Sequence, residues 1–137
     1  MLVEEREYIT IEYLPHWELL QYHWKPNNEL MTEEVYKSEM LNVLDMFRKY
    51  KAQHVLLDAS KSRFVITLKL QEWVNEYIIK PAAMDGLKRI LVVLSEEFIA
   101  QLSMEQMLEE SPDKTFHNHY FASVEEVHDW LKSKFYS

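Results

Sequence analysis

The polar residues that could bind a ligand follow segments that the sequence predicts as buried strands. Ligands of open parallel sheets bind beyond the carboxyl ends of the strands, where free N–H groups at helix starts favour an anion. Residues with such positions are Asp58, Ser60, Arg63, Thr67 and Ser95. They predict a binding site at this edge of the sheet. The alternative interpretation is structural, since Asp, Ser and Thr also cap helices and complete turns.

Serine, histidine and aspartate are all present, but no catalytic pattern joins them. The nucleophile elbow of α/β-hydrolases needs Gly-x-Ser-x-Gly, and phosphate-binding loops need two or three glycines. The chain has one glycine and no cysteine, which also excludes disulfides and thiol nucleophiles. We therefore expect a protein that is not an enzyme and has no cofactor.

His117 and His119 are two positions apart on a predicted strand, so they share one face of it, a spacing compatible with a metal. A matched third ligand is lacking, because Asp113 falls in a predicted loop and His128 on the following helix. We interpret the pair as ordinary surface or partly buried histidines and predict no metal site.

The segment from Ser95 to Asp113 combines acidic residues, without Lys or Arg, and apolar residues that include methionines. Three interpretations are open: a surface that docks a partner protein, the lid of a pocket for an apolar small molecule, or an amphipathic helix pair that packs on the sheet. The residues predicted to line the pocket are Trp73, Tyr77, Phe98 and Met104.

Composition narrows the class of protein further. The 137 residues include 23 acidic and 15 basic ones, and the net charge of −8 argues against a nucleic-acid partner. The longest apolar run, Ile90–Leu94, is too short to span a membrane, and the N-terminus lacks the pattern of a secretory signal. We expect a single cytoplasmic domain over residues 1–137 with no membrane span.

Strands and helices alternate along the chain. Apolar patterns predict strands at Tyr8–Tyr13, Trp17–Trp24, His54–Leu57, Ile90–Leu94 and Phe116–Phe121. Hydroxyl caps predict helix starts at Thr32, Thr67, Ser95 and Ser123. The order ββαβαβαβα predicts an α/β fold: a mostly parallel sheet of about five strands, the first antiparallel, with about four helices.

Four further residues refine these helices, and residues 111–114 are predicted as a loop. Ser103 with Gln106 forms a capping box, which predicts that the third helix breaks into two. Pro81 disturbs the second helix, and Gly86 ends it at a position where a left-handed residue is needed.

Several segments, in this order and spacing, resemble a known family. They are Val55-Leu56-Leu57-Asp58, Leu70-Gln71-Glu72-Trp73, Gly86-Leu87-Lys88-Arg89 before Ile90–Leu94, Gln101-Leu102-Ser103-Met104-Glu105-Gln106, and Tyr120-Phe121 to Trp130-Leu131. Together they resemble the SpoIIAA-like proteins of the STAS superfamily, specifically the stand-alone bacterial STAS/SEC14-like set. The resemblance implies a sheet with helices packed against it in a βα superhelical order.

The resemblance also implies a function. It implies a non-catalytic regulatory or protein-interaction module in bacterial signalling, whose partner is another protein. In the best-understood relatives a partner kinase phosphorylates a serine at the helix start after the strand that is Val55–Asp58 here. Thr67 is the only hydroxyl at that helix start in this chain, while Ser60 and Ser62 lie in the preceding loop.

Two other kinds of partner stay open at this point. The family label also implies the alternative function, a small domain that binds an apolar or lipid-like ligand. Exposed edges at the first hairpin and the last strand would allow a homodimer.

Overall fold

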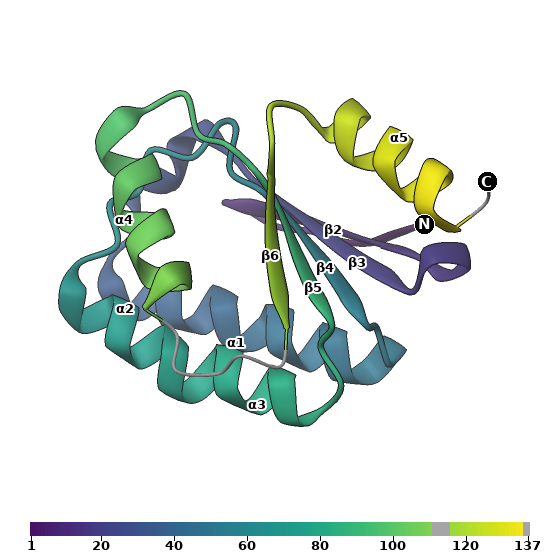
Figure 1. The fold of residues 1–137 in the computed structure, drawn as a ribbon. Coiled ribbons are helices and arrows are strands. Elements are labelled where there is room, and N and C mark those ends of the chain that lie inside the picture. Colours follow the sequence, from purple (N-terminus) through teal and green to yellow (C-terminus); the bar gives the residue numbers. More distant parts are fainter. Residues whose placement is uncertain (111–115, 136–137) are drawn as a thin grey trace.

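Six strands form one sheet whose strand order follows the order of the chain, in a computed structural model that describes residues 1–110 and 116–135 (Figure 1). The strands are β1 (Leu2–Glu5), β2 (Ile9–Leu14), β3 (Leu19–Trp24), β4 (His54–Asp58), β5 (Arg89–Val93) and β6 (His117–Phe121). Strand β2 runs antiparallel to β1 and β3, and β3 to β6 are parallel. The predicted α/β fold with a mostly parallel sheet is confirmed. The loop predicted at 111–114 lies outside the described residues.

Helices connect the parallel strands. They are α1 (Glu33–Tyr50), α2 (Leu68–Val74), α3 (Lys80–Met84), α4 (Phe98–Glu109) and α5 (Val124–Phe135). A π-helical turn, η3 (Asn75–Ile79), joins α2 to α3 without a break, so four helical rods result, as predicted. Two 3₁₀ turns, η1 (Pro15–Trp17) and η2 (Pro26–Leu30), flank β3.

The first part of the sheet differs from the prediction. Strand β1 was not predicted, because its four residues do not alternate and it pairs only at the edge of the sheet. Strand β3 begins at Leu19 and not at Trp17, because Pro15 starts a 3₁₀ turn. This turn places the Trp17 side chain in the core beneath α5.

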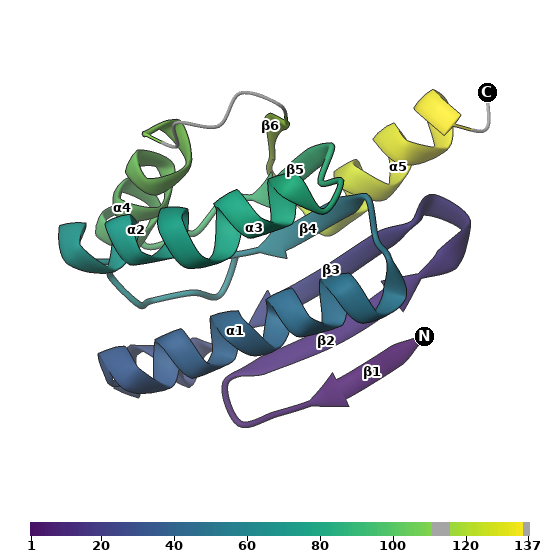
Figure 2. The ribbon, with the colours of Figure 1, turned by 90° about the horizontal axis from the view of Figure 1, so that it is seen from below.

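Alternate strand residues divide the sheet into two unlike faces. Helices α1 to α4 cover one face and form the larger apolar core with it (Figure 2). On the other face, Val127 and Leu131 of α5 are fully buried against Leu56 and Leu91, which contributes about 1.5–3 kcal/mol for each helix residue. Helix α5 packs mainly on β5 and β6, so Glu12 of β2 and His23 of β3 are partly exposed beside it, while Gln21 is buried.

Most of the predicted helix starts are confirmed. The hydroxyls of Thr32 and Thr67 accept hydrogen bonds from N–H groups three residues later, and Ser123 does the same before α5. The prediction that Ser95 caps the third helix is wrong, because the carboxylate of Glu97 accepts from the N–H groups of Ile99 and Ala100.

The predicted break at Ser103 is also wrong. Its hydroxyl donates to the Ala100 carbonyl one turn back, so α4 continues through this position, and it accepts from the Ile66 N–H. Ser103 therefore joins α4 to the chain segment that precedes α2.

The second helix is irregular next to Pro81 and ends before Gly86, as the sequence predicts. The π-helical turn immediately precedes Lys80-Pro81, and proline has no N–H to offer to a regular helical ladder. Gly86 follows α3 with a φ of +100°, a left-handed conformation that glycine adopts with little strain.

Candidate functional site

The binding residues predicted from the sequence lie at the carboxyl edge of β4 and β5 or in the segment that follows β4. Asp58 is the last residue of β4 and is buried. Its Oδ1 accepts hydrogen bonds from the Ser60 N–H at 3.0 Å and from the Ser60 hydroxyl at 2.6 Å. Asp58 and Ser60 are therefore brought together, but they bind each other.

The rest of this loop is fixed by Asn28, which lies in the η2 turn after β3. The Asn28 side chain is fully buried, donates to the Ser62 hydroxyl at 2.8 Å and accepts from the Arg63 N–H at 2.8 Å. The Ser95 hydroxyl donates to the Ser62 carbonyl at 2.9 Å. The hydroxyl of Thr67 is used as a helix cap, while the Arg63 residue is exposed.

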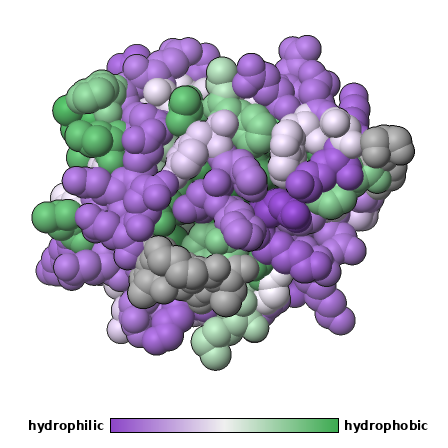
Figure 3. Space-filling model, viewed as in Figure 1, coloured by the Kyte–Doolittle hydropathy of each residue, from purple (hydrophilic) through white to green (hydrophobic). Residues whose placement is uncertain are grey.

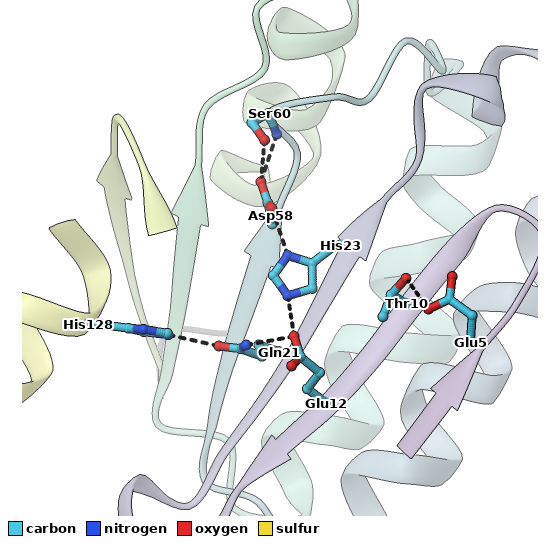
Figure 4. A network of polar contacts seen from close by, with 8 residues as sticks. All are labelled: Glu5, Thr10, Glu12, Gln21, His23, Asp58, Ser60 and His128. Carbon is cyan, nitrogen blue, oxygen red and sulfur yellow. Dashed lines mark hydrogen bonds and ion pairs between the residues drawn. The ribbon is translucent and has the colours of Figure 1, made fainter. Parts of the chain in front are cut away.

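His23 does not stand out in the sequence, and it lies in β3 directly opposite Asp58 of β4. Its Nδ1 is 2.7 Å from the Asp58 carboxylate, and its Nε2 is 2.8 Å from the carboxylate of Glu12 in β2 (Figure 4). An ionised carboxylate only accepts hydrogen bonds, so both ring nitrogens donate. This geometry suits the doubly protonated, positively charged imidazolium.

The pKa values of this group follow from the same geometry. Burial would lower the pKa of His23, but the hydrogen bonds and negative charges of Asp58 and Glu12 outweigh it and raise that pKa. Burial would raise the pKa of Asp58, yet the hydrogen bonds from His23 and Ser60 lower it. The three side chains therefore form a charged row across three strands.

Ser60, His23 and Asp58 do not form a catalytic triad. In a triad the serine hydroxyl donates to a histidine nitrogen, which then accepts the proton. Here the Ser60 hydroxyl donates to Asp58, and both nitrogens of His23 face carboxylates. No nitrogen of His23 is left to act as a base for Ser60.

The polar network continues from this row to α5. Gln21 donates to Glu12 at 2.9 Å, and the Nε2 of His128 in α5 is 2.9 Å from the Gln21 amide oxygen (Figure 4). These contacts join β2, β3 and α5 on the face of the sheet that α5 covers only in part, which we call the half-covered face.

A second histidine lies at the opposite, amino end of this face. The Nδ1 of His54 donates to the Trp17 carbonyl at 3.0 Å, and its Nε2 accepts from the Arg89 guanidinium at 3.1 Å. A carbonyl can only accept and a guanidinium can only donate, so these partners fix the neutral tautomer. Burial lowers the pKa of His54, and the charges of Arg89 and Lys88 lower it further, against the hydrogen bond to Trp17.

The residues predicted to line an apolar pocket have different environments. Trp73 contacts Tyr77, with ring centroids 5.7 Å apart, but Tyr77 is 56% exposed and Phe98 is 72% exposed. Met104 is buried in the core. A cavity of about 50 Å³ does lie between the sheet, α1, α2–α3 and α4, with Val43, Val74 and Met107 in its wall, but Trp73, Tyr77 and Phe98 do not line it.

Large apolar side chains are exposed near the same carboxyl edge. We call them the edge patch; they are Val65, Leu68, Phe98, Ile99 and Leu102. The Ile66 N–H donates to the Ser103 hydroxyl at 3.0 Å, which fixes the Val65–Leu68 segment beside α4. Figure 3 shows apolar side chains gathered over the start of α4.

Within residues 1–110 and 116–135, no three or more histidine, aspartate or glutamate side chains are arranged to hold a metal ion. None of the helices in the same ranges has both the length and the apolar character that a bilayer span requires.

Comparison of the chain with protein-family models, with curated proteins and with solved structures finds no match.

Proposed function

We propose that this chain is a non-catalytic protein-interaction module that binds another protein through the edge patch. The observation that carries the proposal is the exposure of five large apolar side chains in one region, where a soluble domain gains nothing from exposing them. The patch borders the loop after Asp58 and the helix start at Thr67, the surface that the sequence predicts for a partner.

The state of the polar residues supports a binding role over a catalytic one. The Asp58 carboxylate accepts hydrogen bonds from both His23 and Ser60, and Asn28 fixes the loop beside them. Such a network holds the edge in one shape, which lowers the entropy cost of binding a partner. It offers no side chain poised for proton transfer to a substrate.

We further propose a regulatory role of the STAS type in bacterial signalling. The sequential order of the parallel strands β3 to β6, joined by helices, supports this assignment because the resemblance implies a βα superhelical order.

A small apolar ligand is the second candidate. It is supported by the cavity beneath α2–α3 and α4, whose wall consists of apolar side chains such as Val74 and Ile78. A volume of about 50 Å³ suits a molecule of only a few atoms, so a lipid chain would need these helices to move apart. Native mass spectrometry of the purified protein would detect a retained ligand, and an unliganded mass would argue against this candidate.

The main proposal is tested by separating partner binding from folding. The variant Phe98→Ser/Leu102→Ser removes the centre of the edge patch, and Met84→Ser is the control, since Met84 is 78% exposed at the end of α3. A partner isolated with the wild-type protein and then purified should bind the double variant roughly tenfold or more weakly.

The control should bind that purified partner like the wild type, and both variants should unfold at wild-type urea concentrations. Equal binding by the double variant would refute the role of the edge patch.

A further inference from the structure

The exposed surface of α4 changes character along its length. Phe98, Leu102, Glu105 and Glu109 are spaced by four, three and four residues, which places them in one stripe along the helix. Phe98 and Leu102 are exposed and apolar, Glu105 is partly exposed, and Glu109 is exposed. The stripe is therefore apolar toward the start of α4 and acidic toward its end.

The acidic half lies where the helix itself disfavours it. The carbonyl end of a helix carries partial negative charge and is stabilised by basic residues, yet the last turn of α4 contains no basic residue. Glu110 adds another carboxylate directly after the helix. Glu105 and Glu109 accept hydrogen bonds from the uncharged side chains of Gln101 and Tyr120, and within residues 1–110 and 116–135 neither carboxylate forms an ion pair.

The pKa of the neighbouring Tyr120 phenol reflects the same negative charges. Burial raises the pKa of Tyr120, and the hydrogen bond to Glu109 together with the charges of Glu109 and Glu105 raises it further. A partner that brings positive charge to this end of α4 would therefore compensate both the carboxylates and the helix dipole.

We propose that the stripe on α4 binds an amphipathic segment of another protein that carries apolar residues at one end and Lys or Arg at the other. The stripe from Phe98 to Glu109 is about 16 Å long, at 1.5 Å for each residue, which matches three turns of a partner helix. This inference rests on the proposed function and adds the chemical class of the partner.

A second copy of this chain does not have the required chemistry. Two α4 helices packed in parallel would place acidic halves together. Packed antiparallel, they would place the acidic half of each against Phe98 and Leu102 of the other. In the parallel arrangement the carboxylates would repel one another. In the antiparallel arrangement they would lose their solvation without gaining a positively charged partner.

Two synthetic helical peptides of equal length test the charge requirement. Both carry Leu and Phe at one end, and the other end carries three Lys in one peptide and three Glu in the other. We expect the Lys peptide to bind at least about tenfold more tightly, with an affinity that falls as salt rises. Amide chemical shifts should change along α4 and not on α5.

Variants of the protein separate the two halves of the stripe. Glu105→Gln/Glu109→Gln keeps both hydrogen-bond acceptors and should weaken the Lys peptide roughly fivefold, while Phe98→Ser/Leu102→Ser should abolish its binding. The control Glu33→Gln/Glu125→Gln removes the same charge from exposed positions on α1 and α5 and should leave the affinity unchanged.

Equal binding of the two peptides at the edge patch would overturn this inference and leave the proposed function standing. Binding of neither peptide, or shifts confined to other elements, would also overturn the inference. The proposed function fails by a different result, namely a purified partner whose affinity does not depend on Phe98 and Leu102.

Discussion

His23 and His54 lie on the same face of the sheet, on neighbouring strands, yet their partners favour opposite charge states. His23, at the carboxyl end of β3, has a carboxylate on each ring nitrogen. His54, at the amino end of β4, lies between a carbonyl and a guanidinium. Both rings are removed from water to a large extent, so burial alone does not decide the charge. The atoms facing the two nitrogens decide it.

The two ends of this face of the sheet also differ in the elements that their histidines hold together. At the carboxyl end, the charged row across β2, β3 and β4 aligns the strands and holds the loop after Asp58. At the amino end, His54 joins the Trp17 turn to β5 and contacts Phe135 of α5, with ring centroids 5.4 Å apart. The first end holds the start of the loop after Asp58, and the second end packs against α5.

The largest effect is expected from removing the central carboxylate of the charged row. Asp58→Ala deprives the Ser60 N–H, the Ser60 hydroxyl and the His23 ring of their acceptor. Loss of these partly buried, charge-assisted bonds should reduce the free energy of unfolding by about 2–3 kcal/mol, measured by urea denaturation. Asp45→Ala, at an exposed position of α1, is the control and should change it by less than about 0.5 kcal/mol. A loss of similar size in both variants would contradict the role of Asp58.

A smaller effect on stability is expected when the pH changes, and its sign differs between His23 and His54. The pKa of His23 is raised above its ordinary 6.5, so its contribution to stability is complete below pH 6.5 and is lost as the pH rises through the folded-state value. The pKa of His54 is lowered, so its contribution is present above pH 6.5 and is lost as the pH falls through its folded-state value.

The directions of these pH effects can be measured by following the titration of both imidazole rings with NMR and by repeating the urea denaturation over a pH series. His23→Gln should remove part of the decline on the alkaline side, and His54→Gln part of the decline on the acidic side. His54 should lose its proton at a lower pH than His23. The reverse order of titration would contradict the conclusion that the two histidines favour opposite charge states.

The smallest effect is expected where the charged row meets α5. Gln21→Leu removes one donor to Glu12 and the acceptor of His128, while Glu12 keeps its contact with His23. The expected loss is about 1 kcal/mol in the free energy of unfolding. Faster hydrogen exchange confined to α5 would confirm the local origin of this loss, whereas equally faster exchange in α1 would contradict it.

Much of the fold could be predicted from the sequence because the apolar patterns are local. The alternation over Tyr8–Tyr13 and the apolar run at Ile90–Leu94 correspond to β2 and β5. Strand β1 could not be predicted, since it pairs through its backbone at an edge and its side chains show no apolar period. Ser95 resembles a cap in sequence, but the chain takes two more residues before α4 begins.

The candidate site was only partly predictable. Asp58 and Ser60 stand out because they follow a buried strand. His23 does not, because its partner Asp58 is 35 residues away and the contact depends on the register of two parallel strands. The alternation over β3 does place His23 and Gln21 on the polar face of the strand, so a known register would have revealed the row. The edge patch could be predicted only as one of three interpretations of the segment from Ser95 to Asp113, because exposed apolar residues have the same types as core residues.

The sequential strand order has a consequence for how the protein is assembled during synthesis. Each strand pairs with the one made just before it, so β1, β2, β3, α1 and β4 can close their part of the sheet while later segments are still being translated. Every parallel pairing from β3 onward needs only the intervening helical crossover, which keeps the sequence separation of its contacts modest. Helix α5 is the exception, because the surface it covers exists only after β5 and β6 have joined. The half-covered face is thus the last to be completed, and until then its apolar residues Leu56 and Leu91 are open to the solvent or to a chaperone.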